Sequence, residues 1–209
     1  MMTIQKFQQL YQIQNQEMDE LDKAIMLVQV FADMSEFAVS KLKTSEFNKL
    51  CRKINKSFEG FDKELINGKP KNIIKANGRW YFLNMDIEQL NAGRYVEMAT
   101  YCKDVIPNLH MIMATMCTPM EWSWNGLKIR KFKAENHSKY ADDFLQADFN
   151  VAYQCAVFFY AVLFKSMESS LSSLKNQQGI KVEVLQRILE KSLDGFIQPK
   201  WYQNLKLSV

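Results

Sequence analysis

The chain has 209 residues and a formal net charge of +4, which is enough length for one substantial hydrophobic core or two small ones. Apolar residues make up 47% of the chain and charged residues 24%, and this balance excludes a disordered polymer. The 7 glycines and 4 prolines are too few for the turns of an all-β protein of this size. Composition therefore predicts a mainly α-helical fold.

The first 60 residues predict a bundle of three or four short amphipathic helices. Three residues are placed to cap the third and fourth of them: Ser35, and Thr44 or Ser45. Apolar side chains recur at three- and four-residue spacing within residues 4–13, 18–32, 35–42 and 45–58.

The residue pattern changes after this helical segment. The sequence Asn-Gly-Lys-Pro at residues 67–70 is typical of a turn or linker. We therefore expect an N-terminal helical subdomain over residues 1–62 and a second, helical domain over residues 72–209.

Two β-hairpins are predicted within the second domain. Asn77-Gly78, flanked by apolar residues, is the strongest two-residue hairpin signal, and it places one hairpin near residues 73–83. Trp122, Trp124, Leu127 and Ile129 alternate around Asn125-Gly126, which places a second hairpin near residues 121–130.

The remainder of the second domain is predicted to be helical. Helices are expected to begin at Asn91 and near Pro107, and to occupy residues 134–146 and 181–193. Asp148 is placed to cap the most apolar helix, whose uninterrupted apolar run covers 155–164. A membrane span needs about 20 apolar residues, so we interpret this helix as a buried core element.

Residue patterns for catalysis and ligand binding are weak. Neither His110 nor His137 has a second histidine or cysteine at a metal-ligand spacing, and the glycine loops that bind phosphates are missing. Asp142-Asp143 is expected on a solvated helix face. We therefore predict no catalytic, cofactor or metal site and no enzymatic activity. A cysteine–histidine pair that meets only in space stays open beside the alternative of buried thiols.

Positive charge is concentrated in the middle of the chain. Residues 71–140 hold 10 basic and 6 acidic residues, and four of the cations fall within six positions. They are Lys128, Arg130, Lys131 and Lys133. This cluster is either a solvated loop or strand edge or a small phosphate-binding patch.

Methionine and tryptophan are the candidates for binding a partner. Twelve methionines are many for this length, and methionine either fills irregular gaps in a core or forms adaptable grooves for helical peptides. Tryptophans serve as core or interface anchors. The predicted partner-binding residues are Met98, Met111, Met113, Met116, Trp122, Trp124, Trp201 and Tyr202.

Two segments resemble proteins of tailed bacteriophages. Residues 20–54, ELDKAIMLVQVFADMSEFAVSKLKTSEFNKLCRKI, are similar to small tail-assembly chaperones, and residues 79–101, RWYFLNMDIEQLNAGRYVEMATY, are similar to tail-assembly or virion proteins of phages that infect Bacteroidota. The apolar positions that carry the first resemblance are Leu21, Ile25, Val28, Phe37, Leu42, Phe47, Leu50 and Ile54.

The resemblance implies a non-enzymatic chaperone that binds the long, helical tape-measure protein, or other tail subunits, during tail assembly. A structural component of the tail or neck and a small nucleic-acid-binding regulator are the alternatives, with nucleic acid the less favoured partner. We expect no cofactor, no small-molecule substrate and no membrane partner. The amino-terminal sequence lacks the pattern of a signal peptide, which predicts the cytoplasm, that of the host cell for a phage protein, or the virion.

Overall fold

The computed structural model describes residues 1–58, 70–84 and 92–159 of the chain. Over these residues the protein is mainly α-helical with one small antiparallel sheet, as predicted. The helices are α1 (Ile4–Gln14), α2 (Glu20–Ala32), α3 (Glu36–Ser40), α4 (Thr44–Phe58), α6 (Ala92–Tyr101), α7 (Val105–Met116), α8 (His137–Leu145) and the short 3₁₀ helix η2 (Ala134–Asn136). A further helix begins at residue 149 and is described as far as residue 159.

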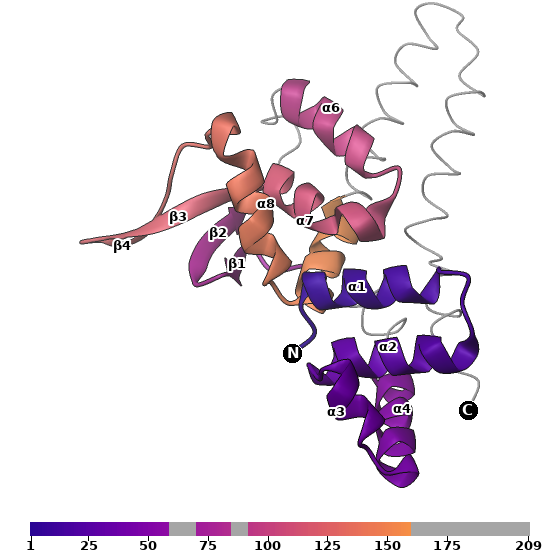
Figure 1. Cartoon of the computed structure of the whole chain (residues 1–209). Helices are drawn as coiled ribbons and strands as arrows, with labels where there is room; N and C mark the ends of the chain where they lie inside the picture. Colours follow the sequence, from indigo (N-terminus) through magenta and orange to yellow (C-terminus); the bar gives the residue numbers. More distant parts are fainter. Residues whose placement is uncertain (59–69, 85–91, 160–209) are drawn as a thin grey trace, which may run out of the picture.

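The sheet lies at one side of the molecule, next to α7 and α8, and α2–α4 lie on the other side of α1 (Figure 1). Within the described ranges, each helix is too short or too polar to span a bilayer. The helix predicted over residues 181–193 and the tail with Trp201 and Tyr202 lie outside the described residues.

Polar side chains begin several helices, as the sequence pattern indicates. Ser35 Oγ accepts from the backbone N–H of Ala38 at 3.3 Å, and Asp148 Oδ1 accepts from that of Val151 at 3.1 Å. Both caps were predicted. Each satisfies one of the backbone donors that a helix leaves unpaired in its first turn.

The two predicted hairpins form, but they join into one sheet. Strands β1 (Ile73–Ala76), β2 (Arg79–Leu83), β3 (Cys117–Ser123) and β4 (Gly126–Ile129) lie in the order β1-β2-β3-β4, all antiparallel. Strand β2 of the first hairpin pairs with strand β3 of the second, although α6 and α7 lie between these strands in the sequence. The prediction of separate hairpins is therefore corrected to one four-stranded sheet.

Turn geometry differs between the two hairpins. Asn77 has a φ of 46° and Gly78 a φ of 76°, as the predicted two-residue turn with two left-handed positions requires. In the second hairpin Ser123 pairs with Gly126, so Trp124 and Asn125 form the turn and Gly126 carries the positive φ of 97°. The second turn therefore lies one residue earlier than the Asn-Gly pattern predicts, and it places Trp124 at the end of the hairpin.

Strand β3 begins four residues earlier than predicted, because Pro119 is tolerated inside it. The carbonyl oxygen of Pro119 accepts from the N–H of Arg130 at 2.9 Å, so the nitrogen of Pro119 faces the same side. Strand β4 ends at Ile129, which pairs with Met120. The position that a backbone N–H would have at Pro119 therefore lies beyond the end of β4, so the proline removes no hydrogen bond between the two strands.

Helix α1 packs into the core built by the second half of the chain. The rings of Phe7 and Phe149 stack with centroids 3.6 Å apart, and both side chains are fully buried. The N–H of Ile4 donates to Ala147 at 3.0 Å and that of Phe149 to Met2 at 2.8 Å. Residues near the amino terminus and residues near 150 therefore share one hydrophobic core, while the boundary predicted near residues 62–72 stays a prediction.

Gln8 joins α1 to the start of α7. Its side-chain nitrogen donates to the carbonyl oxygens of Ile106 and Pro107 at 2.8 and 2.9 Å, and lies 3.0 Å from Nδ1 of His110. The nitrogen has two hydrogens for these three acceptors, so Nδ1 of His110 shares one of them when the neutral ring carries its proton on Nε2.

We expect acid to weaken this contact. Burial lowers the pKa of His110, Asp142 opposes that shift and His137 adds to it. The pKa of His110 is lower in the folded protein than in the unfolded chain, where it is near 6.5. The folded protein is therefore most stable, with respect to this group, above pH 6.5, and it loses stability as the pH falls below that value. Between pH 7.5 and pH 5.5 the urea midpoint of unfolding should fall more for the natural protein than for His110→Gln. Equal falls in the two proteins would contradict the prediction.

Candidate functional site

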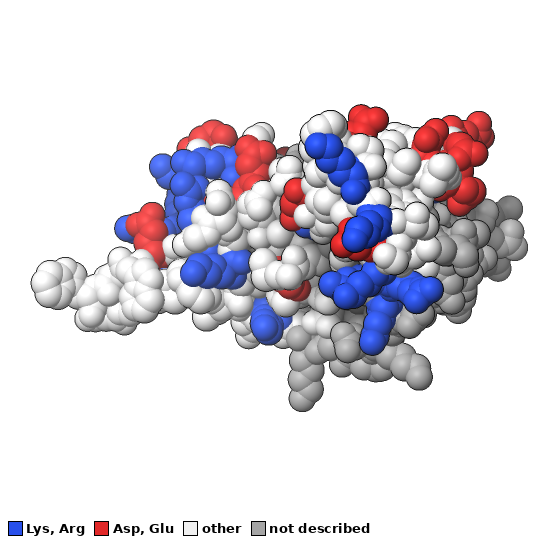
Figure 2. Space-filling view, turned by 60° about the horizontal axis from the view of Figure 1, so that its bottom comes forward, with Lys and Arg blue, Asp and Glu red and all other residues white. Residues whose placement is uncertain are grey.

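The β3–β4 hairpin projects from the body and carries large apolar side chains. Trp122 is 73% exposed, Trp124 104% and Ile129 52%. In Figure 2 this hairpin forms the lobe at the left, whose end is built of uncharged residues, and Lys and Arg side chains lie on the body beside it. The end of the hairpin is therefore an uncharged projection next to a surface that carries both basic and acidic side chains.

The sheet has one buried face and one open face. Cross-strand partners share a face, so the pairing of Trp80 with Met120 and of Met120 with Ile129 places the three together. We call this the outer face. Its members are Ile73, Lys75, Trp80, Phe82, Thr118, Met120, Trp122, Leu127 and Ile129.

The opposite, inner face carries the core side chains Ile74, Ala76, Tyr81, Leu83 and Cys117, all buried. An antiparallel sheet with one solvated face normally alternates apolar and polar side chains. Here the outer face is apolar as well, and Trp122 and Ile129 on it are exposed. This departure marks the outer face and the hairpin end as a candidate binding surface.

A hollow of about 700 Å³ lies beside the hairpin, and its lining includes Trp80, Met120 and Trp122 of the outer face. Strands β2 and β3 supply one wall, the segment after β4 another, and η2 and α8 the third. Of the lining residues, Glu121 alone is acidic, and it pairs with Arg130. The charged lining residues are Arg79, Glu121, Arg130, Lys131, Lys133 and Lys139.

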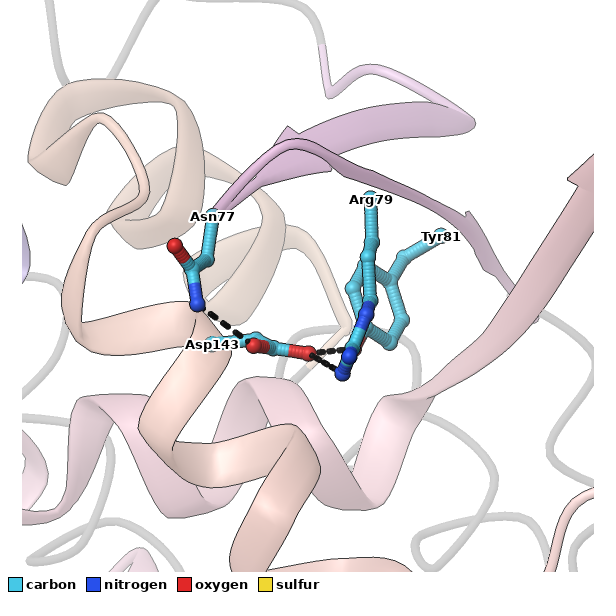
Figure 3. Close-up of polar contacts among 4 residues, drawn as sticks. All are labelled: Asn77, Arg79, Tyr81 and Asp143. Atoms are coloured by element: carbon cyan, nitrogen blue, oxygen red, sulfur yellow. Dashed lines mark hydrogen bonds and ion pairs between the residues drawn. The ribbon is translucent and has the colours of Figure 1, made fainter.

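Asp143 of α8 anchors the first hairpin through polar contacts with three of its residues (Figure 3). Its Oδ1 accepts from Nδ2 of Asn77 at 2.8 Å, and its Oδ2 accepts from Nη1 of Arg79 at 2.7 Å and from the hydroxyl of Tyr81 at 2.5 Å. Asp143 is only 3% exposed, so the prediction of a solvated Asp142-Asp143 pair is wrong for Asp143. Asp142 is exposed, as predicted.

Electrostatics in this cluster favour a structural role. Burial raises the pKa of the Tyr81 hydroxyl, and the hydrogen bond to Asp143 raises it further. The hydrogen bond to Asp143 also raises the pKa of Arg79. Tyr81 therefore stays protonated as a donor and Arg79 stays charged, so both hold the carboxylate in place.

The predicted partner-binding residues are divided by the structure. Met98, Met113 and Met116 are buried and Met111 is half-buried, which corrects the predicted groove to the alternative, a core filled by methionine. The reason is that α7 is enclosed on several sides by α6, α8 and α1. Trp122 and Trp124 are exposed, whereas Trp201 and Tyr202 lie outside the described residues.

The cysteines and histidines are arranged as core residues. All four cysteines are buried and free, and burial raises the pKa of Cys102 to about 12 and that of Cys155 to about 11. Such thiols stay protonated near neutral pH and are poor nucleophiles. Nε2 of His137 lies 3.0 Å from Oγ1 of Thr115. Within the described ranges no group of three or more acidic, histidine or cysteine side chains is arranged to hold a metal ion.

The sequence pointed to some of the charged residues that line the hollow. Arg130, Lys131 and Lys133 of the predicted basic cluster line it, but Lys128 does not. Arg79 and Lys139 were missed, because only the pairing of β2 with β3 and the packing of α8 bring them there. The buried position of Asp143 had a signal, since it lies one helical turn from Tyr140 on the apolar side of α8.

Comparison of the sequence with protein-family models, with curated proteins and with solved structures finds no match. The functional assignment therefore rests on the residues and the geometry of the chain itself.

Proposed function

We propose that this chain is a non-enzymatic binding protein that holds a protein partner on the β3–β4 hairpin and the outer face. The exposure of Trp122 and Trp124 on a projecting hairpin carries the proposal. Tryptophan buries a large area on binding at a small entropic cost, and it is enriched among the residues that dominate binding energy.

The surroundings of the two tryptophans support a protein partner. Leu127 and Ile129 continue the apolar surface along β4. Strand β4 is also at the edge of the sheet, where backbone donors and acceptors are available for pairing with an added strand.

The specific role that we propose is that of a phage tail-assembly chaperone. The resemblance of residues 20–54 and 79–101 implies a tape-measure protein as the partner, held in the host cytoplasm until the tail forms around it. Long apolar helices aggregate when they are exposed, and an apolar surface that projects from the body can cover them. A structural component of the tail or neck could use the same surface, but it would be found in purified particles at a fixed copy number.

The test is co-expression with a phage tape-measure protein, and the proposal expects its reading frame to lie next to the gene of this chain. The natural protein should raise the soluble fraction of that tape-measure protein and bind it in calorimetry with a negative heat-capacity change. Trp122→Ser and Trp124→Ser should each cost about 2 kcal/mol of binding free energy, which is about thirtyfold in affinity.

The matched control replaces two exposed apolar residues elsewhere. Leu21 is 61% exposed and Phe37 68%, so Leu21→Ser with Phe37→Ser removes a similar amount of apolar surface from α2 and α3. This control should keep the affinity of the natural protein. An unchanged affinity in the tryptophan variants would overturn the proposed surface, and the absence of heat with the natural protein would overturn the proposed partner.

A further inference from the structure

The hollow beside the β3–β4 hairpin collects more positive charge than the ion pairs among the described residues neutralise. Arg130 pairs with Glu121, and Arg79 pairs with Asp143. The other cations, Lys131, Lys133 and Lys139, are exposed. The ion pairs found in the described part of the chain include none of these three lysines. Three ammonium groups therefore surround a hollow whose acidic side chain is already paired.

The size of the hollow and the spread of its charge indicate a ligand with several anionic groups. About 700 Å³ is far more than one phosphate fills. Lys131 and Lys133 follow β4, whereas Lys139 lies on α8. Cations distributed in this way match a chain of phosphates better than one anion at a single point.

The kind of cation distinguishes nucleic acid from a phosphorylated peptide. Phosphate groups on peptides are recognised mainly by arginine clusters, whose planar groups bind in a bidentate manner. Both arginines of the hollow are already paired with carboxylates. The lysines that remain bind phosphate as flexible point charges, which suits the sequence-independent contacts of a nucleic-acid backbone.

We propose that this hollow binds the phosphate backbone of a single-stranded nucleic acid through Lys131, Lys133 and Lys139. A single strand can bend into a hollow of this size beside the hairpin, and a positively charged groove that follows the backbone is the usual means of binding it. The three lysines are not members of the outer face, although Trp80, Met120 and Trp122 of that face also line the hollow.

The test measures the binding of a fluorescent 20-nucleotide thymidine strand to the full chain by anisotropy between 50 and 200 mM salt. With about three phosphates neutralised, the logarithm of the association constant should fall with a slope of about −2 against the logarithm of salt concentration. The triple variant Lys131→Gln, Lys133→Gln, Lys139→Gln should bind at least about tenfold more weakly and lose most of that slope.

The control variant carries Lys43→Gln, Lys49→Gln and Lys56→Gln, which lower the net charge equally at exposed positions in or next to α4. It should bind within about twofold of the natural protein. An equal loss of affinity in the two triple variants would overturn the site, since it would show attraction by net charge alone. Circular dichroism checks that both fold, and the single variant Lys139→Gln should weaken binding about threefold.

Competition identifies the ligand. A matched duplex and a phosphoserine peptide should displace the labelled strand only at higher concentrations than unlabelled thymidine strand does. Displacement by the peptide or the duplex at lower concentrations would overturn the assignment to single-stranded nucleic acid. The lysine variants leave Trp122 and Trp124 in place, so this result does not depend on the protein partner.

Discussion

Replacing Asp143 by alanine should lower the free energy of unfolding by about 3 kcal/mol, because it leaves buried donors without an acceptor. Three side chains donate to this carboxylate, from Asn77, Arg79 and Tyr81. The hydroxyl of Tyr81 is buried within the sheet–helix contact, so water cannot replace the lost partner without a rearrangement. Urea unfolding at neutral pH measures the change.

Two further variants test the cause of this loss. Asp142→Ala, at the exposed neighbouring position, should change stability by less than about 0.5 kcal/mol. Asp143→Ala should cost about 1 kcal/mol less when Tyr81 is already phenylalanine, since the orphaned hydroxyl is then absent. Additive losses in the double variant would show that the carboxylate does not act through Tyr81.

Replacing Phe7 by alanine should cost about 4 kcal/mol and lower the melting temperature by about 10 °C. The ring stacks on Phe149 with an interplanar angle of 13°, and both rings are fully buried. Truncation removes apolar contact and leaves a cavity between α1 and the helix that begins at residue 149. The backbone hydrogen bonds from Ile4 to Ala147 and from Phe149 to Met2 hold the two segments together and limit the collapse of this cavity.

The control for this prediction is Phe37→Ala. Phe37 is also a helical phenylalanine, but its ring is largely exposed, so its truncation should change stability by less than about 0.5 kcal/mol. Differential scanning calorimetry compares the two variants directly. Similar melting temperatures for Phe7→Ala and the natural protein would show that α1 is not part of the main core.

Strand alternation explains how one hairpin presents two different chemistries. Along β3 and β4, Trp122 and Leu127 form one cross-strand pair, and Glu121 and Lys128 form the next. Because neighbouring residues of a strand point to opposite faces, the apolar pairs lie on the outer face and the charged pairs on the inner one. Trp122 also lines the hollow, so the apolar face and the hollow adjoin each other on this hairpin.

Helices and hairpins were predictable because their signals are local. The cap at Ser35, the cap at Asp148 and the turn at Asn77-Gly78 each depend on residues within four positions of one another. The second hairpin turn, at Trp124 and Asn125, lies one residue before the predicted position. The reason is that a glycine with positive φ occupies different positions in hairpin turns of different type.

By itself the sequence determined the mainly helical class, the two hairpins and the apolar stripes of the helices, since these depend on spacing along the chain. Tertiary structure alone decided that β2 pairs with β3, that Asp143 is buried beneath them and that Arg79 and Lys139 line one hollow. It also decided that Met113 fills the core while Trp124 stays exposed. These outcomes depend on contacts between residues far apart in the chain, and the periodicity of one segment does not specify which other segment will cover it.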